Sequence, residues 1–253
     1  LRGVYTASQC CERWNIVTVF VYVFQRTIIF VFKYQAMSIP LEHEKIFHVF
    51  NRGNNKENIF TDSEDYTHFL QLYSLYIQPI ADTYAWCLMK NHFHFCIRIK
   101  DLKDIGFLDK SNAKSQDLKK KWEFYYDIKN LSANHFKPSP DSQLKLFFNA
   151  YAMWFNARHN RSGSLFKKNC NKKLVDNMSY LADLIVYINN NPIKHGFENH
   201  PGNYSWSSYN EVINDSYKLC DREIIKLIFE DDENFKHLHS IKFDDEIEWG
   251  DFE

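Results

Sequence analysis

The segment from Leu88 to Lys100, LMKNHFHFCIRIK, constrains the fold of this chain more than any other segment. From position 92 onward, polar or sulfur-containing residues alternate with apolar ones: His92, Phe93, His94, Phe95, Cys96 and Ile97. A side-chain period of two is that of a β-strand, in which successive residues point to opposite faces of a sheet. The segment therefore predicts a strand that buries one apolar face and presents two histidines side by side on the other.

The surrounding sequence predicts further strands and helices. We expect strands at 45–53, 83–89, 92–99 and 172–175, and helices at 61–77, 143–160 and 177–191. Lys90 and Asn91 form a plausible tight turn between two of the strands, and Pro192 is expected to close the last helix. The first six elements have the order βαββαβ, which indicates an α+β fold with a ferredoxin-like antiparallel sheet and an added C-terminal helix.

The composition changes along the chain and suggests domain limits. Residues 101–140 are polar, contain two prolines and are expected to be an insertion or linker within a domain spanning 37–215. Residues 1–36 are rich in β-branched and aromatic side chains, but their apolar run is too short to span a bilayer. Because Met37 precedes an ordinary polar opening, we expect residues 1–36 to lie upstream of the natural start. A signal anchor is the alternative.

The charge distribution is strongly asymmetric. Residues 221–253 contain twelve acidic and four basic side chains, a net charge of −8, so a whole-chain net charge of −1 leaves +7 on residues 1–220. Residues 142–175 contain seven lysines or arginines, no acidic residue and several interspersed aromatic side chains. This basic region is either a solvated face or a groove for nucleic acid. Residues 216–253 are expected to form a mobile acidic tail.

Glycine and cysteine usage excludes several classes of protein. The chain has seven glycines and neither a phosphate-binding loop nor a dinucleotide-binding fingerprint. Its six cysteines form no CxxC pair and no disulfide framework, which is typical of reduced thiols in a cytoplasmic protein without membrane association.

The two histidines and the last predicted helix supply the candidate site. His92 and His94 can provide two ligands to one metal ion, although such a pair can also be structural, and a metal site needs a third ligand. Cys96 lies next on the same face, where a thiol is more often packed against a helix. Tyr187 and Asn191 are four residues apart and therefore share one helix face, while a tyrosine in an apolar helix is often simply part of the core.

Four segments together resemble one family. WCLMKNHFHFCI (86–97) is similar to the His-hydrophobe-His motif of the single-tyrosine HUH transposases, which include the REP-associated tyrosine transposases and related small insertion-sequence transposases. FHVFNRGNNKENIF (47–60) resembles the family's opening strand and turn, and YSWSSY (204–209) its closing motif. The tyrosine helix and its Asn-Pro lie within NARHNRSGSLFKKNCNKKLVDNMSYLADLIVYINNNPIKHGF (156–197). The resemblance covers about residues 45–209 and departs from the family at Lys90, where proline is common.

The resemblance implies a function and a set of site residues. His92, His94 and Asn191 match the ligands of a divalent ion, Mg²⁺ or Mn²⁺, and Tyr187 on the C-terminal helix matches the nucleophile. Such an enzyme binds single-stranded or hairpin DNA, cleaves it to a 5′-phosphotyrosine and a free 3′-hydroxyl, and rejoins it without ATP. A homodimer is a possible state of such an enzyme. From their charge, we expect four cations to hold the DNA backbone: Arg158, Arg161, Lys167 and Lys168.

Two other functions remain open at this point. The first is a domesticated module that binds folded single strands without cutting them. The second is an unrelated metal-dependent nuclease or hydrolase that uses His92, His94 and a carboxylate. The sequence does not identify the DNA target or the group that takes the proton from Tyr187.

Overall fold

A computed structural model describes residues 19–24, 27–32, 39–109, 122–123, 134–216 and 218–240. The chain divides into two compact units, residues 1–38 and residues 39–253. In the first unit, β1 (Val19–Phe24) and β2 (Thr27–Phe32) form an antiparallel hairpin. The second unit contains every residue of the predicted site. The expectation that the domain begins at residue 37 stays a prediction.

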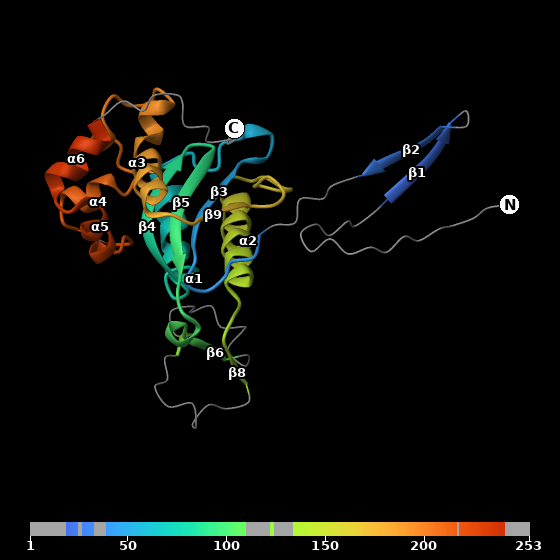
Figure 1. Ribbon diagram of the computed structural model, residues 1–253, viewed down its shortest axis with the longest axis horizontal. Helices are drawn as coiled ribbons and strands as arrows, with labels where there is room; N and C mark the ends of the chain where they lie inside the picture. Colours follow the sequence, from blue (N-terminus) through green and yellow to red (C-terminus); the bar gives the residue numbers. More distant parts are fainter. Residues whose placement is uncertain are drawn as a thin grey trace. The chain divides into compact units, whose positions relative to one another are not determined.

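The second unit is built on a four-stranded antiparallel sheet (Figure 1). Its strands are β3 (Ile46–Arg52), β4 (Ala81–Met89), β5 (His92–Ile99) and β9 (Asn171–Val175), in the spatial order β4-β5-β3-β9. Strand β3 thus lies between β5 and β9. One helix connects β3 to β4, and another lies between β5 and β9 in the chain. This arrangement confirms the predicted α+β fold with a ferredoxin-like sheet.

Two helices cover one face of the sheet. Asp62 caps α1 (Ser63–Tyr76), and Ser139 caps α2 (Pro140–Arg158), which begins with a proline in its first turn. The buried core on this face is largely aromatic and includes Phe47, Phe69, Tyr73, Phe93, Phe95, Phe147 and Tyr151. The residues that alternate with the histidines on β5 point into this core, as the sequence period requires. Burial of this face fixes the register of β5, because a shift by one residue would turn the histidines into the core.

The third helix covers the opposite face. Asn177 caps α3 (Met178–Lys194), whose buried apolar residues pack against β4 and β5. The prediction that Pro192 ends this helix is wrong, because the helix continues to Lys194. Pro192 lacks an N–H donor but lies in the last turn of the helix, and the amide of His195 still donates to the carbonyl of Asn191 at 3.1 Å. Asn191 therefore lies inside the last turn of the helix.

The C-terminal segment packs against β4 and α3. After η6 (Pro201–Asn203), the Leu88 amide donates to the Trp206 carbonyl and the Ser208 amide to the Trp86 carbonyl, at 2.9 and 2.8 Å. The next elements are α4 (Tyr209–Ile213), α5 (Arg222–Phe229) and α6 (Asp232–Ser240). The prediction of a mobile acidic tail is wrong for residues 222–240, because these helices bury apolar side chains beside α3 while their acidic residues face outward. Residues 241–253 lie outside the described residues.

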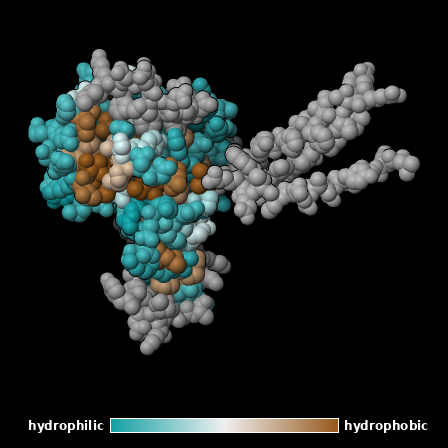
Figure 2. Space-filling view, viewed as in Figure 1, coloured by the Kyte–Doolittle hydropathy of each residue, from teal (hydrophilic) through white to brown (hydrophobic). Residues whose placement is uncertain are grey.

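Part of the predicted insertion also has regular structure. Strands β6 (Phe107–Asp109), β7 (Trp122–Glu123) and β8 (His135–Phe136) form a small sheet after η2 (Leu102–Asp104). Hydrophilic residues cover most of the visible surface of the second unit (Figure 2). Among the described residues, no helix is both long and apolar enough to span a membrane.

Candidate functional site

The two histidines of β5 and the tyrosine of α3 lie together on the α3 face of the sheet. The rings of His92 and His94 have centroids 5.2 Å apart. The ring of Tyr187 lies 5.8 Å from that of His94 and almost perpendicular to it, at 85°. The alternation along β5 positions the histidines, and the packing of α3 brings the tyrosine over them.

Asn191 meets His92 at the edge of this group. Its Oδ1 lies 3.4 Å from His92 Nε2, while its Nδ2 donates to the Tyr187 carbonyl at 3.4 Å. On the other side of the ring, His92 Nδ1 donates to Asn91 Oδ1 at 2.7 Å. In the neutral imidazole, Nε2 then carries a lone pair that faces the lone pairs of the Asn191 oxygen. Two such atoms repel each other unless a proton or a cation lies between them, so this arrangement suits two ligands of one metal ion.

His48, which was not among the residues predicted from the sequence, completes the group. His48 Nε2 and His94 Nδ1 lie 3.0 Å apart and share one hydrogen bond. Metal-ligating histidines usually donate their second ring N–H to a partner of this kind, which fixes the tautomer and the ring orientation. His48 occupies the same face of β3 as Phe50 and Arg52, so the period-two pattern of IFHVFNR is the signal that could have revealed it.

The electrostatic environment keeps the central imidazoles neutral. Burial lowers the pKa of His94 well below its ordinary value, and the nearby His48, His92, His195 and Lys194 lower it further. Burial, with a smaller effect of Lys173, lowers the pKa of His48 to about 3. A neutral imidazole is the form that binds metal.

The candidate ligand set contains an amide. Among the described residues, no three His, Cys, Asp or Glu side chains are grouped so as to hold a metal ion. A metal site at the histidine pair therefore needs a third ligand of another type, and the amide oxygen of Asn191 is in the right place. Asparagine oxygen is a ligand for Mg²⁺ and Mn²⁺.

Two further groups border the site. The ammonium of Lys194 lies 5.2 Å from the centre of the Tyr187 ring, and the ring of His195 lies 5.0 Å from that of His92. Tyr187 itself is 5% exposed. Lys194 is the last residue of α3 and His195 is its C-cap, and the prediction that Pro192 closes the helix hid their position.

The three asparagines at the end of α3, Asn189 to Asn191, contact different parts of the protein. Only Asn191 faces the histidines. Asn189 accepts a hydrogen bond from Ser208 at 2.6 Å and donates to His239 at 3.1 Å, and Asn190 donates to the His239 carbonyl at 3.0 Å. Asn189 and Asn190 thus attach α4 and α6 to α3.

Cys96 belongs to the core. It is fully buried in the cluster under α3, and burial raises the pKa of its thiol, which opposes the thiolate form required for metal binding. Cys87, Cys170 and Cys220 are also free thiols, whereas Cys10 and Cys11 lie outside the described residues.

Arg158, predicted to bind DNA, forms ion pairs within the protein. Its guanidinium contacts the carboxylates of Asp62, Glu64 and Asp65 at 2.7 to 2.8 Å, joining the end of α2 to the start of α1. The structure therefore does not bring Arg158 together with the histidines, which lie on the other face of the sheet. Its surrounding acidic side chains also leave no net positive charge for a DNA phosphate.

The other predicted cations divide into two kinds. Arg161 pairs with Glu57 at 2.7 Å. Lys167 and Lys168 are exposed, and the Lys167 amide donates to the Arg52 carbonyl at 2.8 Å. Arg52, at the end of β3, and Lys56, in the turn that follows, line one pocket with Lys167, although the sequence pointed to neither of them. The absence of acidic residues from 142–175 pointed to Lys167. Nothing in the sequence near Lys167 predicted that it would lie beside residues 52–56.

Comparisons with known proteins give a limited result. No protein-family model and no curated protein matches the chain. A solved structure of a REP-associated tyrosine transposase bound to a REP hairpin is similar to 76% of this chain and 90% of its own, at 13% identity and a TM-score of 0.43. At this level of similarity, the function has to be inferred from the side chains themselves.

Proposed function

We propose that this chain is an HUH-type single-tyrosine DNA transposase, which cleaves and rejoins single-stranded or hairpin DNA through Tyr187. One observation carries the proposal: His92, His94 and Asn191 converge beside the tyrosine ring, with His92 Nε2 and Asn191 Oδ1 facing each other at 3.4 Å. These four residues are those that the resemblance to the transposase family selects in the sequence.

The proposed cofactor is Mg²⁺ or Mn²⁺. His92 Nε2, the second ring nitrogen of His94 and Asn191 Oδ1 would hold it, while Asn91 and His48 fix the orientation of the two imidazoles. When bound, a divalent ion supplies a positive charge that polarises a non-bridging phosphate oxygen.

The protein's own residues account for the covalent step. The Tyr187 oxygen forms a bond to phosphorus as the bond from phosphorus to the 3′ oxygen breaks; the phenol gives up its proton and the 3′ oxygen takes one up. An ordinary phenol has a pKa of about 10 and is a weak nucleophile at neutral pH. The Lys194 ammonium, 5.2 Å from the ring centre, favours the negative charge that develops on the phenol oxygen. The resulting phosphotyrosine conserves the energy of the broken bond for rejoining.

A second candidate function is a DNA-binding module that does not cut. The observation that favours it is burial: Tyr187 is 5% exposed and Asn191 is 0% exposed, so the structure leaves a phosphate little access to either side chain. The third function, a nuclease with a carboxylate ligand, gains no support, since no Asp or Glu completes the histidine pair among the described residues.

A covalent-adduct experiment tests the proposal. The protein is incubated with single-stranded and hairpin oligonucleotides from the flanks of its own gene, in Mg²⁺, Mn²⁺ or EDTA, and the products are separated under denaturing conditions. We expect a protein–DNA adduct only with metal, and peptide mass spectrometry should assign its phosphate to Tyr187. Binding without any adduct in either metal would leave the DNA-binding module as the function.

A further inference from the structure

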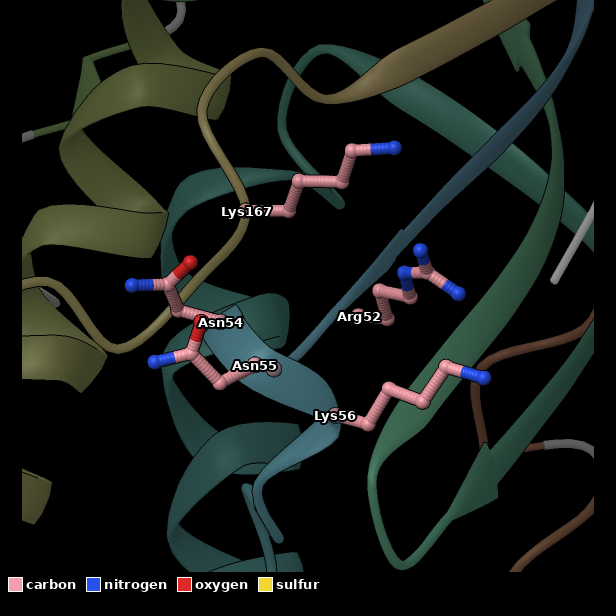
Figure 3. Close-up of a pocket in the computed structure, with 6 residues that line it drawn as sticks. Arg52, Asn54, Asn55, Lys56 and Lys167 are labelled. Carbon is pink, nitrogen blue, oxygen red and sulfur yellow. The ribbon is translucent and has the colours of Figure 1, made fainter.

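A basic hollow lies beside the candidate site and has no assigned role. It has a volume of about 520 Å³ and is lined by Arg52, Gly53, Asn54, Asn55, Lys56 and Lys167. In Figure 3, the side chains of Arg52, Lys56 and Lys167 extend toward the same side, whereas those of Asn54 and Asn55 point the other way. Two segments that are distant in the sequence thus direct three cationic side chains to one place.

The backbone of the hollow is held in an uncommon conformation. Asn55 and Lys56, in η1 (Asn54–Lys56), have φ angles of 53° and 62°, in the left-handed region that residues other than glycine seldom adopt. At Gly53, a Cβ atom would lie 2.0 Å from the Glu57 carbonyl oxygen, so only glycine fits there. Asparagine tolerates this region, but for Lys56 it is uncommon, so the surrounding structure has to hold Lys56 in this conformation.

Hydrogen bonds join this turn to the segment that carries Lys167. The Asn54 amide donates to the Leu165 carbonyl and the Lys167 amide to the Arg52 carbonyl, each at 2.8 Å. The Asn51 side chain donates to the Lys167 carbonyl at 3.3 Å. These hydrogen bonds therefore hold the backbones of the two segments side by side, and the three cationic side chains extend from them.

The charges of the hollow are not compensated by acidic side chains. Within the described residues, no carboxylate lies within ion-pair distance of Arg52, Lys56 or Lys167, and none lines the hollow. Other cations of the basic region are paired, for example Arg161 with Glu57 and Lys172 with Asp141. Three cationic side chains that line one hollow, with no acidic partner among the described residues, form a site for an anion with several oxygen atoms, such as a phosphate group.

The hollow is next to the histidine pair. Arg52 lies directly opposite His92 in the antiparallel register of β3 and β5, and both residues point to the α3 face of the sheet. Directly opposed residues have Cβ atoms about 5 Å apart. A strand with one phosphate at His92 would therefore bring a neighbouring phosphate within reach of Arg52.

We propose that this hollow is a binding subsite for a backbone phosphodiester of single-stranded DNA, next to the phosphate that is cut. The inference rests on the proposed function for the identity of the strand, and it assigns to Arg52 and Lys56 a role that the sequence did not suggest. The subsite holds the strand beside the scissile bond and takes no part in breaking it.

The test measures binding without chemistry. Fluorescence anisotropy of a labelled oligothymidylate is recorded in EDTA, over a series of NaCl concentrations, for the whole protein and for Lys56→Gln and Lys167→Gln. Each exposed lysine is expected to contribute about tenfold in affinity at low salt. Each substitution should also lower the slope of log affinity against log salt by up to about 1.

The matched control is Lys145→Gln, at another exposed lysine, on α2 at the opposite face of the sheet. Its affinity and salt slope should stay at those of the unmodified protein, and all three variants should keep its melting temperature. Equal weakening by Lys145→Gln would show a diffuse charge effect and overturn the subsite.

A second arm separates DNA from free phosphate. Inorganic phosphate is titrated at matched ionic strength into the unmodified protein and the two variants. If phosphate binds only the unmodified protein, while the DNA affinity of the variants stays unchanged, the hollow is a free-phosphate site and the proposal fails.

The adduct assay in Mn²⁺ is independent of both arms. An adduct formed by the unmodified protein, together with unchanged DNA binding by Lys56→Gln and Lys167→Gln, would overturn the subsite alone. Loss of DNA binding in these variants without any adduct in the unmodified protein would overturn strand cleavage and leave the subsite in place.

Discussion

His48 Nε2 lies 3.0 Å from His94 Nδ1, and this fully buried hydrogen bond joins β3 to β5 directly beside Tyr187. The orientation of one candidate ligand is therefore set by a residue 46 positions earlier in the chain. The same relationship leaves the other ring nitrogen of His94 for a metal ion. It extends the candidate site from one strand and one helix to two strands and a helix.

Removal of the hydrogen bond from His48 should weaken metal binding. We expect His48→Ala to lower the affinity for Mn²⁺ by about 10- to 100-fold, because His94 loses the partner that fixes its ring. His48→Gln, which retains a hydrogen-bonding side chain, should lose less. Isothermal titration calorimetry with Mn²⁺ measures this, with His43→Ala as the control at a histidine that instead binds the Lys100 carbonyl. Unchanged Mn²⁺ affinity in His48→Ala would limit His48 to a packing role.

Tyr187→Phe should separate DNA binding from chemistry. The substitution removes one oxygen from a ring that still packs, so we expect the melting temperature and the DNA affinity to change little. Cleavage, strand transfer and the covalent adduct should disappear together, since each requires the phosphotyrosine. The control is Tyr180→Phe, two turns earlier on α3, which should remain active in the same gel assay. Strong cleavage by Tyr187→Phe would point to water as the nucleophile.

The charge cluster around Asp65 should contribute to stability and not to DNA binding. Asp65 is fully buried and accepts hydrogen bonds from Thr61, Arg158 and His159. Burial raises the pKa of this carboxyl, but the hydrogen bonds from Thr61 and His159 outweigh it and hold the pKa below its ordinary value. We expect Asp65→Asn to lower the free energy of unfolding by about 2 kcal/mol in urea titrations.

Arg158 provides the complementary test of this cluster. Arg158→Gln should leave the affinity for single-stranded DNA and its salt dependence unchanged, since three carboxylates already neutralise the guanidinium. A clear loss of DNA affinity in Arg158→Gln, at an unchanged melting temperature, would return this residue to the DNA-binding surface.

The attachment of the C-terminal helices should weaken in acid. Burial lowers the pKa of His239 from its ordinary value of 6.5 to about 4, and the effect of burial exceeds that of its hydrogen bond to the Phe235 carbonyl. Between these two values the unfolded chain binds a proton that the folded chain does not. The contribution of His239 to stability is therefore complete above about pH 6.5 and is lost as the pH falls toward 4. This loss lowers the free energy of unfolding by up to about 3 kcal/mol.

Urea unfolding at pH 7 and pH 4.5 measures this contribution. Burial also lowers the pKa of His48 and of His94, so these two residues make the protein less stable in acid as well. The contribution of His239 is therefore obtained by comparing variants. His239→Gln should show a smaller loss of stability between the two pH values than the unmodified protein. His237→Gln, at an exposed histidine on the same helix, should show the same loss as the unmodified protein. An equal loss of stability between pH 7 and pH 4.5 in both variants would show that His239 is not the group responsible.

The sequence by itself determined the sheet and the pair of histidines. The alternation along residues 92–99 predicts which side chains of β5 are buried, and the order of strands and helices predicts the ferredoxin-like topology. Both are local or periodic properties, because a side chain's face on a strand follows from its position alone. The helical spacing of four residues placed Tyr187 and Asn191 on one face of the last helix.

Only the tertiary structure decided which side chains meet. Strand pairing brings His48 to the candidate site. Acidic residues at the start of α1 bind Arg158 on the other face of the sheet. Hydrogen bonds between distant segments bring together the backbones that carry Arg52, Lys56 and Lys167. The C-terminal helices became part of the core because their apolar faces fit α3, although their charge suggested a mobile tail. Hydrogen bonds and ion pairs depend on distances of a few ångströms between residues far apart in the chain, and composition and spacing do not encode those distances.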